Sequence, residues 1–172
     1  MAVVFCGTAV GNRSALRQAY YAGIGNSFWK TLHEVGLTPS QFEPEQYRSA
    51  TAFGLGFTDL AKNISGNDVD LRDEHFARDA LRRKILKFQP RVVAFTSKRA
   101  AQEFLRRPVQ YGPLEEVIGS SRLFVLPSPS GAARRWWQVD VWHDLAKLLQ
   151  GQHRTSHSTR SRVKRAPGLR QR

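Results

Sequence analysis

The chain has 172 residues with 41% hydrophobic and 10% aromatic content, which excludes a disordered protein and predicts one folded domain with a core. Its formal net charge of +13 favours a polyanion as partner, nucleic acid before membrane, although some proteins are basic for solubility alone. The single cysteine, Cys6, excludes a disulfide framework and a cysteine zinc site.

The sequence has no apolar run of transmembrane length, and its start lacks the basic, apolar and small-residue order of a signal peptide. We therefore expect a cytoplasmic, DNA-associated location and no membrane partner. The five histidines are scattered along the sequence, which argues against a metal site.

Short apolar runs rich in branched residues predict four buried parallel strands, at Val3–Gly7, Phe53–Thr58, Val92–Ser97 and Leu123–Pro127. The stretches between and after them predict helices at 27–36, 70–90, 97–107 and 136–150. The helix at 70–90 is expected to start at Asp70, with Asp73 three residues on, and to stop before Pro90. This alternation predicts an α/β fold with a central, mostly parallel, four-stranded sheet.

The composition changes at Gly151. Residues 151–172 contain seven Arg or Lys, no acidic residue and almost no apolar residues, so they cannot bury enough surface to fold alone. We therefore expect a folded domain at 1–150 and a disordered basic tail at 151–172. Subtracting the seven charges from +13 leaves +6, so the folded part is itself basic. The tail is either a phosphate-binding arm or a solvated terminus with no task.

Parallel sheets bind ligands at the carboxyl ends of their strands, so the loops after the predicted strands are considered together. These loops are GTAVGNRSALRQAYYAGIGNSFWK, DLAKNISGND, TSKRAA and PSPSGAARRWW. Their small residues let the backbone approach a ligand, their Arg and Lys can bind phosphates, and their aromatic rings offer stacking faces. The sequence lacks G-x-G-x-x-G, a Walker sequence, G-x-S-x-G and H-E-x-x-H.

Several of these segments resemble motifs of the uracil-DNA glycosylase superfamily, most closely those of the mismatch-specific uracil/thymine DNA glycosylases. VVFCGTAVG resembles a strand followed by G-I-N-P-G, GNSFWK resembles G-N-R-F-W-K, and LPSPSGAAR resembles L-P-N-P-S-G followed by a wedge residue. GFTDLAKNISGNDVDL and KFQPRVVAF are similar to the middle stretches of the family. The resemblance runs from Val3 to Gln150 and keeps the order of the motifs.

This resemblance implies a three-layer α/β/α sandwich and a monomeric DNA repair enzyme. Such an enzyme flips uracil out of single- or double-stranded DNA and hydrolyses its N-glycosidic bond, which leaves an abasic site. Extrusion is needed because a base inside the stack cannot be reached. The uracil leaves as an anion, so it needs amide donors at its carbonyl oxygens. No metal and no cofactor is implied.

The resemblance also assigns residues to the base site. The amides around Thr8 and Ala9 match main-chain groups that hold a uracil carbonyl. Tyr21 matches the aromatic residue that stacks on the flipped base, and we favour this role over that of a core tyrosine, since tyrosine suits a partly hydrated site. Asn26 either pins its loop or reaches the base, and Ser65 matches a water-holding threonine.

Further residues correspond to the family's DNA-contacting positions. In the last motif, serines and a glycine would approach the backbone of the flipped nucleotide, a small residue occupies the wedge position, and two arginines follow. Two basic residues at a helix start could bind phosphate or form a solvated face. These positions are Ser128, Ser130, Gly131, Ala132, Arg134, Arg135, Lys98 and Arg99.

The sequence departs from the family at Ala9, where the mismatch-specific relatives carry the asparagine that orients the attacking water. Three hypotheses follow: Ser65 and a main-chain carbonyl hold the water, Asp59 has taken over as the acceptor, or the protein no longer cleaves. We favour Asp59, which stands where thymine-acting relatives carry an asparagine at the base edge, although capping the following turn is its plainer role. Asn12 is a further candidate.

Two other classes of function stay open from the sequence. One is a catalytically inactive reader of uracil or abasic sites in DNA. The other is a nucleotide-binding α/β module unrelated to repair, which would bind free nucleotide well and duplex DNA poorly.

Overall fold

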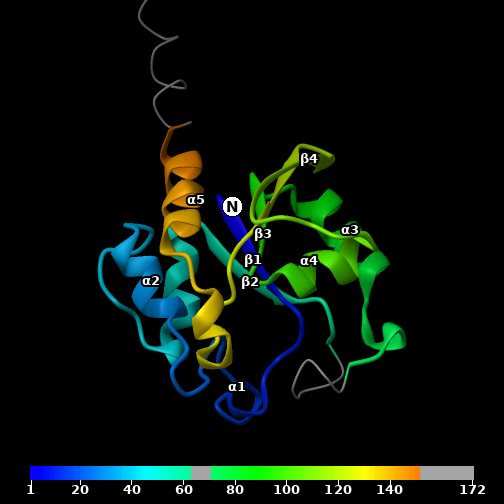
Figure 1. The fold of residues 1–172 in the computed structure, drawn as a ribbon. Coiled ribbons are helices and arrows are strands. Elements are labelled where there is room, and N and C mark those ends of the chain that lie inside the picture. Colours follow the sequence, from blue (N-terminus) through cyan, green and yellow to red (C-terminus); the bar gives the residue numbers. More distant parts are fainter. Residues whose placement is uncertain (63–70, 152–172) are drawn as a thin grey trace, which may run out of the picture.

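A five-stranded sheet forms the centre of the protein, as seen in a computed structural model that describes residues 1–62 and 71–151 (Figure 1). The strand order is β2-β1-β3-β5-β4. The strands comprise β1 (Val3–Gly7), β2 (Leu55–Asp59), β3 (Val92–Phe95), β4 (Gly112–Ile118) and β5 (Ser121–Val125). β1, β2, β3 and β5 are parallel, and β4 pairs antiparallel with β5 at one edge. The predicted α/β class with a mostly parallel sheet is confirmed.

Helices cover both faces of this sheet, so the three-layer arrangement is also confirmed. α2 (Phe28–Glu34) and α5 (Val139–Gly151) cover one face, and α3 (Arg78–Phe88) and α4 (Lys98–Leu105) cover the other (Figure 1). The short α1 (Asn12–Leu16) follows β1. The described part of the chain also contains three 3-10 helices, η1 (Pro44–Phe53), η3 (Asp73–His75) and η4 (Gly131–Trp136).

The layers form because successive side chains of a strand point to opposite faces. In β1, Phe5 belongs to the core under α2 and α5, whereas its neighbour Cys6 belongs to the core under α3 and α4. In β3, Ala94 and Phe95 divide between the two cores in the same way. Such strands are buried on both faces, which is why they are continuous apolar runs in the sequence.

Aromatic rings join the first core. The ring of Phe5 meets Phe28 edge-on, with centroids 5.1 Å apart, and stacks with Trp142 at 6.1 Å. The indole of Trp142 also donates a hydrogen bond to the carbonyl oxygen of Pro127 at 3.3 Å. This bond ties α5 to the loop that follows β5.

The expected number of strands was wrong, because β4 makes a fifth. Its sequence, GPLEEVI, carries two adjacent glutamates, and Glu115, Glu116 and Val117 are all exposed. An edge strand that faces solvent over much of its length has no continuous apolar run, so the pattern used for the other strands does not detect it.

Two predicted helices begin later than expected. The stretch at 70–90 forms η3 and then an extended residue, Phe76, that bridges Ala61, so α3 starts only at Arg78. The expected first residue, Asp70, lies outside the described residues, and the carboxylate of Asp73 binds Arg78 at 2.5 Å and Arg106 at 3.0 Å. The last helix begins at Val139 rather than at residue 136, because η4 occupies the preceding residues.

Candidate active site

The loops at the carboxyl ends of the parallel strands are held together by main-chain hydrogen bonds. The amides of Leu60 and Ala61 donate to the carbonyl oxygens of Gly7 and Thr8, at 2.9 and 2.8 Å. The amide of Ser27 donates to the carbonyl oxygen of Pro129 at 2.9 Å. α1 and η4 lie at this same end of the molecule (Figure 1). The described parts of these segments therefore lie together at one edge of the sheet.

Asp59, the last residue of β2, is the buried acidic group of this surface. Its register partner on β1 is Gly7, and a Cβ atom at Gly7 would collide with Asp59 Oδ1. The side chain is only 5% exposed, and Oδ2 has no hydrogen-bond partner within the part of the chain that the structure describes. Buried polar atoms are almost always paired, so such an oxygen indicates a place for a water or a ligand.

Burial raises the pKa of the Asp59 carboxyl to about 6, and the positive charge of Lys62 partly opposes this rise. Removal from water disfavours the charged form of a carboxyl group, which is the cause of the shift. A carboxyl group that titrates near neutrality is suited to accept or orient a proton at physiological pH.

Tyr21 lies beside this carboxyl group. One face of its ring stacks on Phe28 at a centroid distance of 3.7 Å and an interplanar angle of 12°. Its hydroxyl shares a hydrogen bond of 3.3 Å with Thr96 Oγ1. Tyr21 has a φ of 56°, a left-handed backbone conformation that costs a side-chain-bearing residue free energy and is concentrated at functional sites.

The charge of Asp59 acts on both neighbouring tyrosines. Burial first, and then the negative charge of Asp59, raise the pKa of Tyr20 to about 12 and raise the pKa of Tyr21 as well. Both hydroxyl groups therefore stay protonated near neutral pH, and Tyr21 keeps a neutral ring beside the carboxyl group.

The first loop places Thr8 and Ala9 next to this cluster. Thr8 is buried, and its hydroxyl shares a hydrogen bond of 3.4 Å with Ser97 Oγ. Ala9 is half-buried and packs against the core under α3 and α4. Its methyl group offers no hydrogen bond, so a water here depends on other groups.

Asn26 bonds to its own loop. Its side-chain Oδ1 accepts a hydrogen bond from the main-chain amide of Phe28 at 3.0 Å. Its main-chain amide donates to the carbonyl oxygen of Gly23 at 3.1 Å. This arrangement matches the loop-pinning role. Ser65 lies outside the described residues.

The last motif contacts the loop before α2. A Cβ atom at Gly131 would lie 2.9 Å from the carbonyl oxygen of Ile24, so only glycine allows this approach. Ser128 Oγ accepts a hydrogen bond from the amide of Ser130 at 3.3 Å. Exposed side chains follow this turn, those of Ala132, Arg134 and Arg135.

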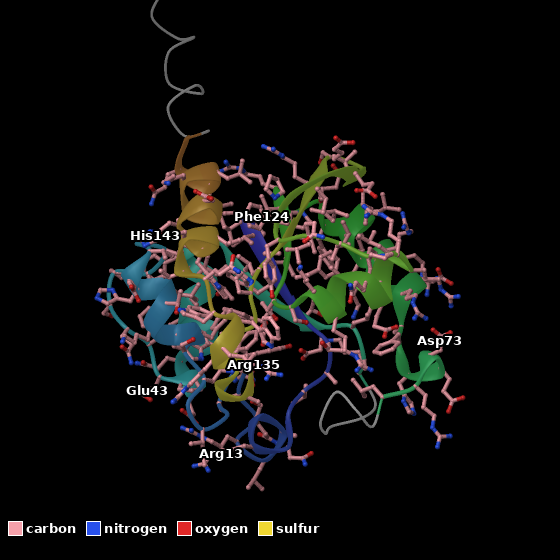
Figure 2. The ribbon with its side chains drawn as sticks, in the orientation of Figure 1. Arg13, Glu43, Asp73, Phe124, Arg135 and His143 are labelled. Atoms are coloured by element: carbon pink, nitrogen blue, oxygen red, sulfur yellow. The ribbon has the colours of Figure 1, made fainter. Side chains whose placement is uncertain are left out.

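Figure 2 shows Arg135 at the same end of the molecule as Arg13 of α1. Basic side chains therefore form a rim at the end of the molecule where β2 ends in Asp59. The two basic residues at the start of α4 have other contacts. Lys98 Nζ donates to Gln110 Oε1 at 3.0 Å, whereas Arg99 pairs with Glu103 at 3.9 Å.

Thr96 is the site residue that sequence reasoning missed. It is buried at the end of β3, and its hydroxyl bonds both Tyr21 and the carbonyl oxygen of Cys6. The one available signal was its position directly after a buried strand. Thr8 follows β1 in the same way, and Asp59 is the last residue of β2.

Comparison with known proteins shows the family and the fold. The model of the Uracil DNA glycosylase superfamily matches residues 1–146. The chain belongs to this superfamily. A solution NMR structure of a protein from Methanosarcina acetivorans, provisionally assigned as a uracil DNA glycosylase, matches with a TM-score of 0.60 and 20% identity. The match covers 87% of this chain and 91% of that one, and it supports the fold.

No helix in ranges 1–62 and 71–151 is long and apolar enough to cross a membrane. No three His, Cys, Asp or Glu residues in these ranges form a group that could hold a metal ion.

The shifted pKa of Asp59 predicts how stability depends on pH. Between the ordinary value of 3.8 and about 6, the unfolded chain releases this proton while the folded protein keeps it. The contribution of Asp59 to the free energy of unfolding therefore falls as pH rises through this window, by about 3 kcal/mol in total, and stays low above it.

Asp59→Asn removes this titration. Urea unfolding at pH 4 and at pH 7.5 should show the variant gaining about 2 kcal/mol relative to wild type between the two pH values, since part of the total lies below pH 4. Asp144→Asn, on the exposed surface of α5, is the control. A constant difference between Asp59→Asn and wild type across this range would contradict the assignment.

Proposed function

We propose that this protein is a DNA repair glycosylase that flips uracil out of DNA and hydrolyses its N-glycosidic bond, leaving an abasic site. The observation that carries the proposal is the buried carboxyl group of Asp59, with an unpartnered Oδ2, beside the stacked ring of Tyr21. A buried, unpaired carboxyl group lowers stability, so its presence at the family's active-site edge is best explained by chemistry.

The flipped uracil would stack on Tyr21. Since Phe28 covers one face of that ring, the base takes the other face. Main-chain amides of Thr8 and Ala9 would donate hydrogen bonds to a uracil carbonyl, where negative charge grows as the base leaves. Asn26 supports this pocket by holding its loop, through the bond to the amide of Phe28.

In the reaction, the bond between the sugar C1′ and the uracil nitrogen breaks, and the uracil leaves with the bonding electrons. The oxygen of a water forms the new bond to C1′. Asp59 accepts a hydrogen bond from this water, takes up its proton, and offsets the positive charge that develops on the sugar. Asp59 thereby orients the water in place of a side chain at position 9, where the methyl group of Ala9 cannot form a hydrogen bond.

The surrounding groups would bind the DNA backbone. The turn at Ser130 and Gly131 lets a phosphodiester approach closely, and Arg134 and Arg135 bring positive charge to the same rim. Sequence-independent contacts of this kind supply affinity and orientation. The basic segment 152–172 adds charge, and it lies outside the described residues.

The function is tested with a panel of oligonucleotides that each carry one lesion, treated with protein and then with alkali. We expect strand breaks at uracil, unchanged by a chelator. Ala132 is too small to fill the gap left by a flipped base, so uracil in a single strand or opposite adenine should be accepted as well as uracil opposite guanine. Tight binding of uracil DNA without cleavage would contradict the proposed glycosylase activity and favour a protein that recognises damaged DNA without cleaving it.

The role of Asp59 predicts a series of rates. Asp59→Ala should lower the single-turnover rate of uracil excision about 100-fold or more, with affinity for uracil DNA retained. Asp59→Asn should recover part of the rate, because an amide oxygen still orients water but carries no charge. Ala9→Asn in the Asp59→Ala background should also restore part of it, by returning a water-orienting group to the first loop.

Ser65→Ala separates the competing hypotheses. If this variant loses activity while Asp59→Ala resembles wild type, Ser65 orients the water and Asp59 caps its turn. If neither substitution lowers the rate, main-chain groups and stabilisation of the leaving uracil suffice, and the role of Asp59 is wrong.

A further inference from the structure

A groove of about 670 Å³ opens beside the candidate active site, lined by Lys98, Gln110, Tyr111, Trp136 and Gln138. These residues come from three segments, the start of α4, the segment that leads into β4, and the end of η4 with the residues that follow it. The register between β4 and β5 places this segment at the carboxyl edge of the sheet, because Gly112 pairs with Val125, the last residue of β5.

The groove adjoins the elements that form the proposed base site. Lys98 directly follows Ser97, whose hydroxyl contacts Thr8 Oγ1 at 3.4 Å. On the other side, η4 runs from Gly131 to Trp136 and joins the groove to the DNA-contacting turn. These two connections place the groove next to the segments that the proposed base site uses.

Two aromatic rings of the groove each form a cation–π contact with a basic side chain. Lys98 Nζ lies 4.5 Å from the centroid of the Tyr111 ring and also donates to Gln110 Oε1. The guanidinium carbon of Arg135 lies 5.1 Å from the centroid of the Trp136 ring. Rings paired with Lys and Arg are suited to bind stacked bases and phosphates together.

Trp136 is unusual because its ring is 60% exposed. The adjacent Trp137 packs against the core, with its centroid 5.8 Å from that of Trp142. Packing in the core therefore explains the tryptophan at position 137, whereas Trp136 lines the groove. An exposed aromatic ring on a basic surface indicates a binding role.

We propose that this groove binds a base of the DNA strand next to the excised nucleotide, stacked on Trp136, with the neighbouring phosphates on Lys98 and Arg135. The proposal rests on the proposed function, since it assigns a subsite for the same substrate. Arg135 lies over one face of the indole, so the base takes the other face. The amides of Gln110 and Gln138 offer donors and acceptors to a base edge without selecting one sequence.

The charge of the chain favours a nucleic acid over a peptide as the occupant. The whole chain carries +13, and within residues 1–62 and 71–151 the cations of the groove lie beside its rings rather than in pairs with acids. None of the five lining residues is acidic. A strand with one phosphate per nucleotide complements this pattern.

The experiment uses single-stranded 15-mers with one central uracil, intact or with the base removed from the nucleotide on its 5′ or its 3′ side. For wild type, loss of the base on one of the two sides should raise the half-saturating protein concentration about tenfold, as expected for the loss of one stacked base. Trp136→Ala should show the same tenfold rise on intact DNA and no further rise when that base is missing. The maximal single-turnover rate should stay within about twofold, because Trp136 does not touch the reacting atoms.

Two variants complete the design. Trp136→Phe keeps an aromatic face and should recover most of the affinity. Phe88→Ala, at the end of α3, removes a ring that is 65% exposed and lies before β3, at the opposite end of the sheet, and it should behave as wild type. Equal affinity of Trp136→Ala and wild type, or independent effects of the missing base and the substitution, would overturn the proposal.

A second measurement separates this proposal from the proposed function. Binding of uracil-free oligothymidylate is followed by fluorescence anisotropy, which requires no cleavage. Trp136→Ala should bind about tenfold more weakly than Phe88→Ala even if wild type cleaves none of the lesion panel. If the two variants bind alike, the groove is no base subsite, whatever the enzyme does. An acidic peptide that displaces the oligonucleotide at equal concentration would also overturn the nucleic-acid assignment.

Discussion

The contact between the carboxyl group of Asp59 and the backbone of Gly7 is the constraint on which the candidate site depends. Parallel pairing of β1 and β2 sets these two residues opposite each other at the ends of their strands. The absence of a side chain at Gly7 leaves the space that Oδ1 occupies. The carboxyl group is thereby held out of water, and its pKa rises to about 6. Any side chain at Gly7 would displace the group that we place at the centre of the chemistry.

At one edge of its sheet the protein thus combines basic side chains on the surface with a buried carboxyl group, that of Asp59. The cations of the rim attract the DNA backbone, and their number outweighs the single buried carboxyl group. Inside, Thr96 lies near the same glycine as Asp59, and the charge of Asp59 acts on two tyrosines that stay neutral. A developing positive charge on a sugar would meet the carboxylate in a place where little water screens the attraction. The same burial lowers stability, which is a frequent property of catalytic groups.

Much of this could be predicted from the sequence, for physical reasons that differ between elements. Strands such as Val92–Phe95 are buried on both faces, so their apolar runs are unmistakable, and their shared polarity brings the loops to one edge. β4 escaped prediction because solvent covers much of it. The start of α3 was misplaced because Phe76 is extended and bridges Ala61, and because Asp73 binds Arg106 at the end of another helix, α4. Contacts between segments far apart in the sequence leave no local pattern. The roles of Thr96 and of the Trp136 groove likewise arise from contacts between segments far apart in the sequence.

The central claim, that the carboxylate of Asp59 acts in the chemical step, is tested most directly by the pH dependence of single-turnover uracil excision at saturating protein. The account predicts a wild-type rate that rises between pH 5 and pH 7 with an apparent pKa of about 6, as Asp59 ionises, and then levels off. Asp59→Asn should be slower at pH 7 and should lose this rise. A variant that keeps both the wild-type rate and the wild-type profile would contradict the account.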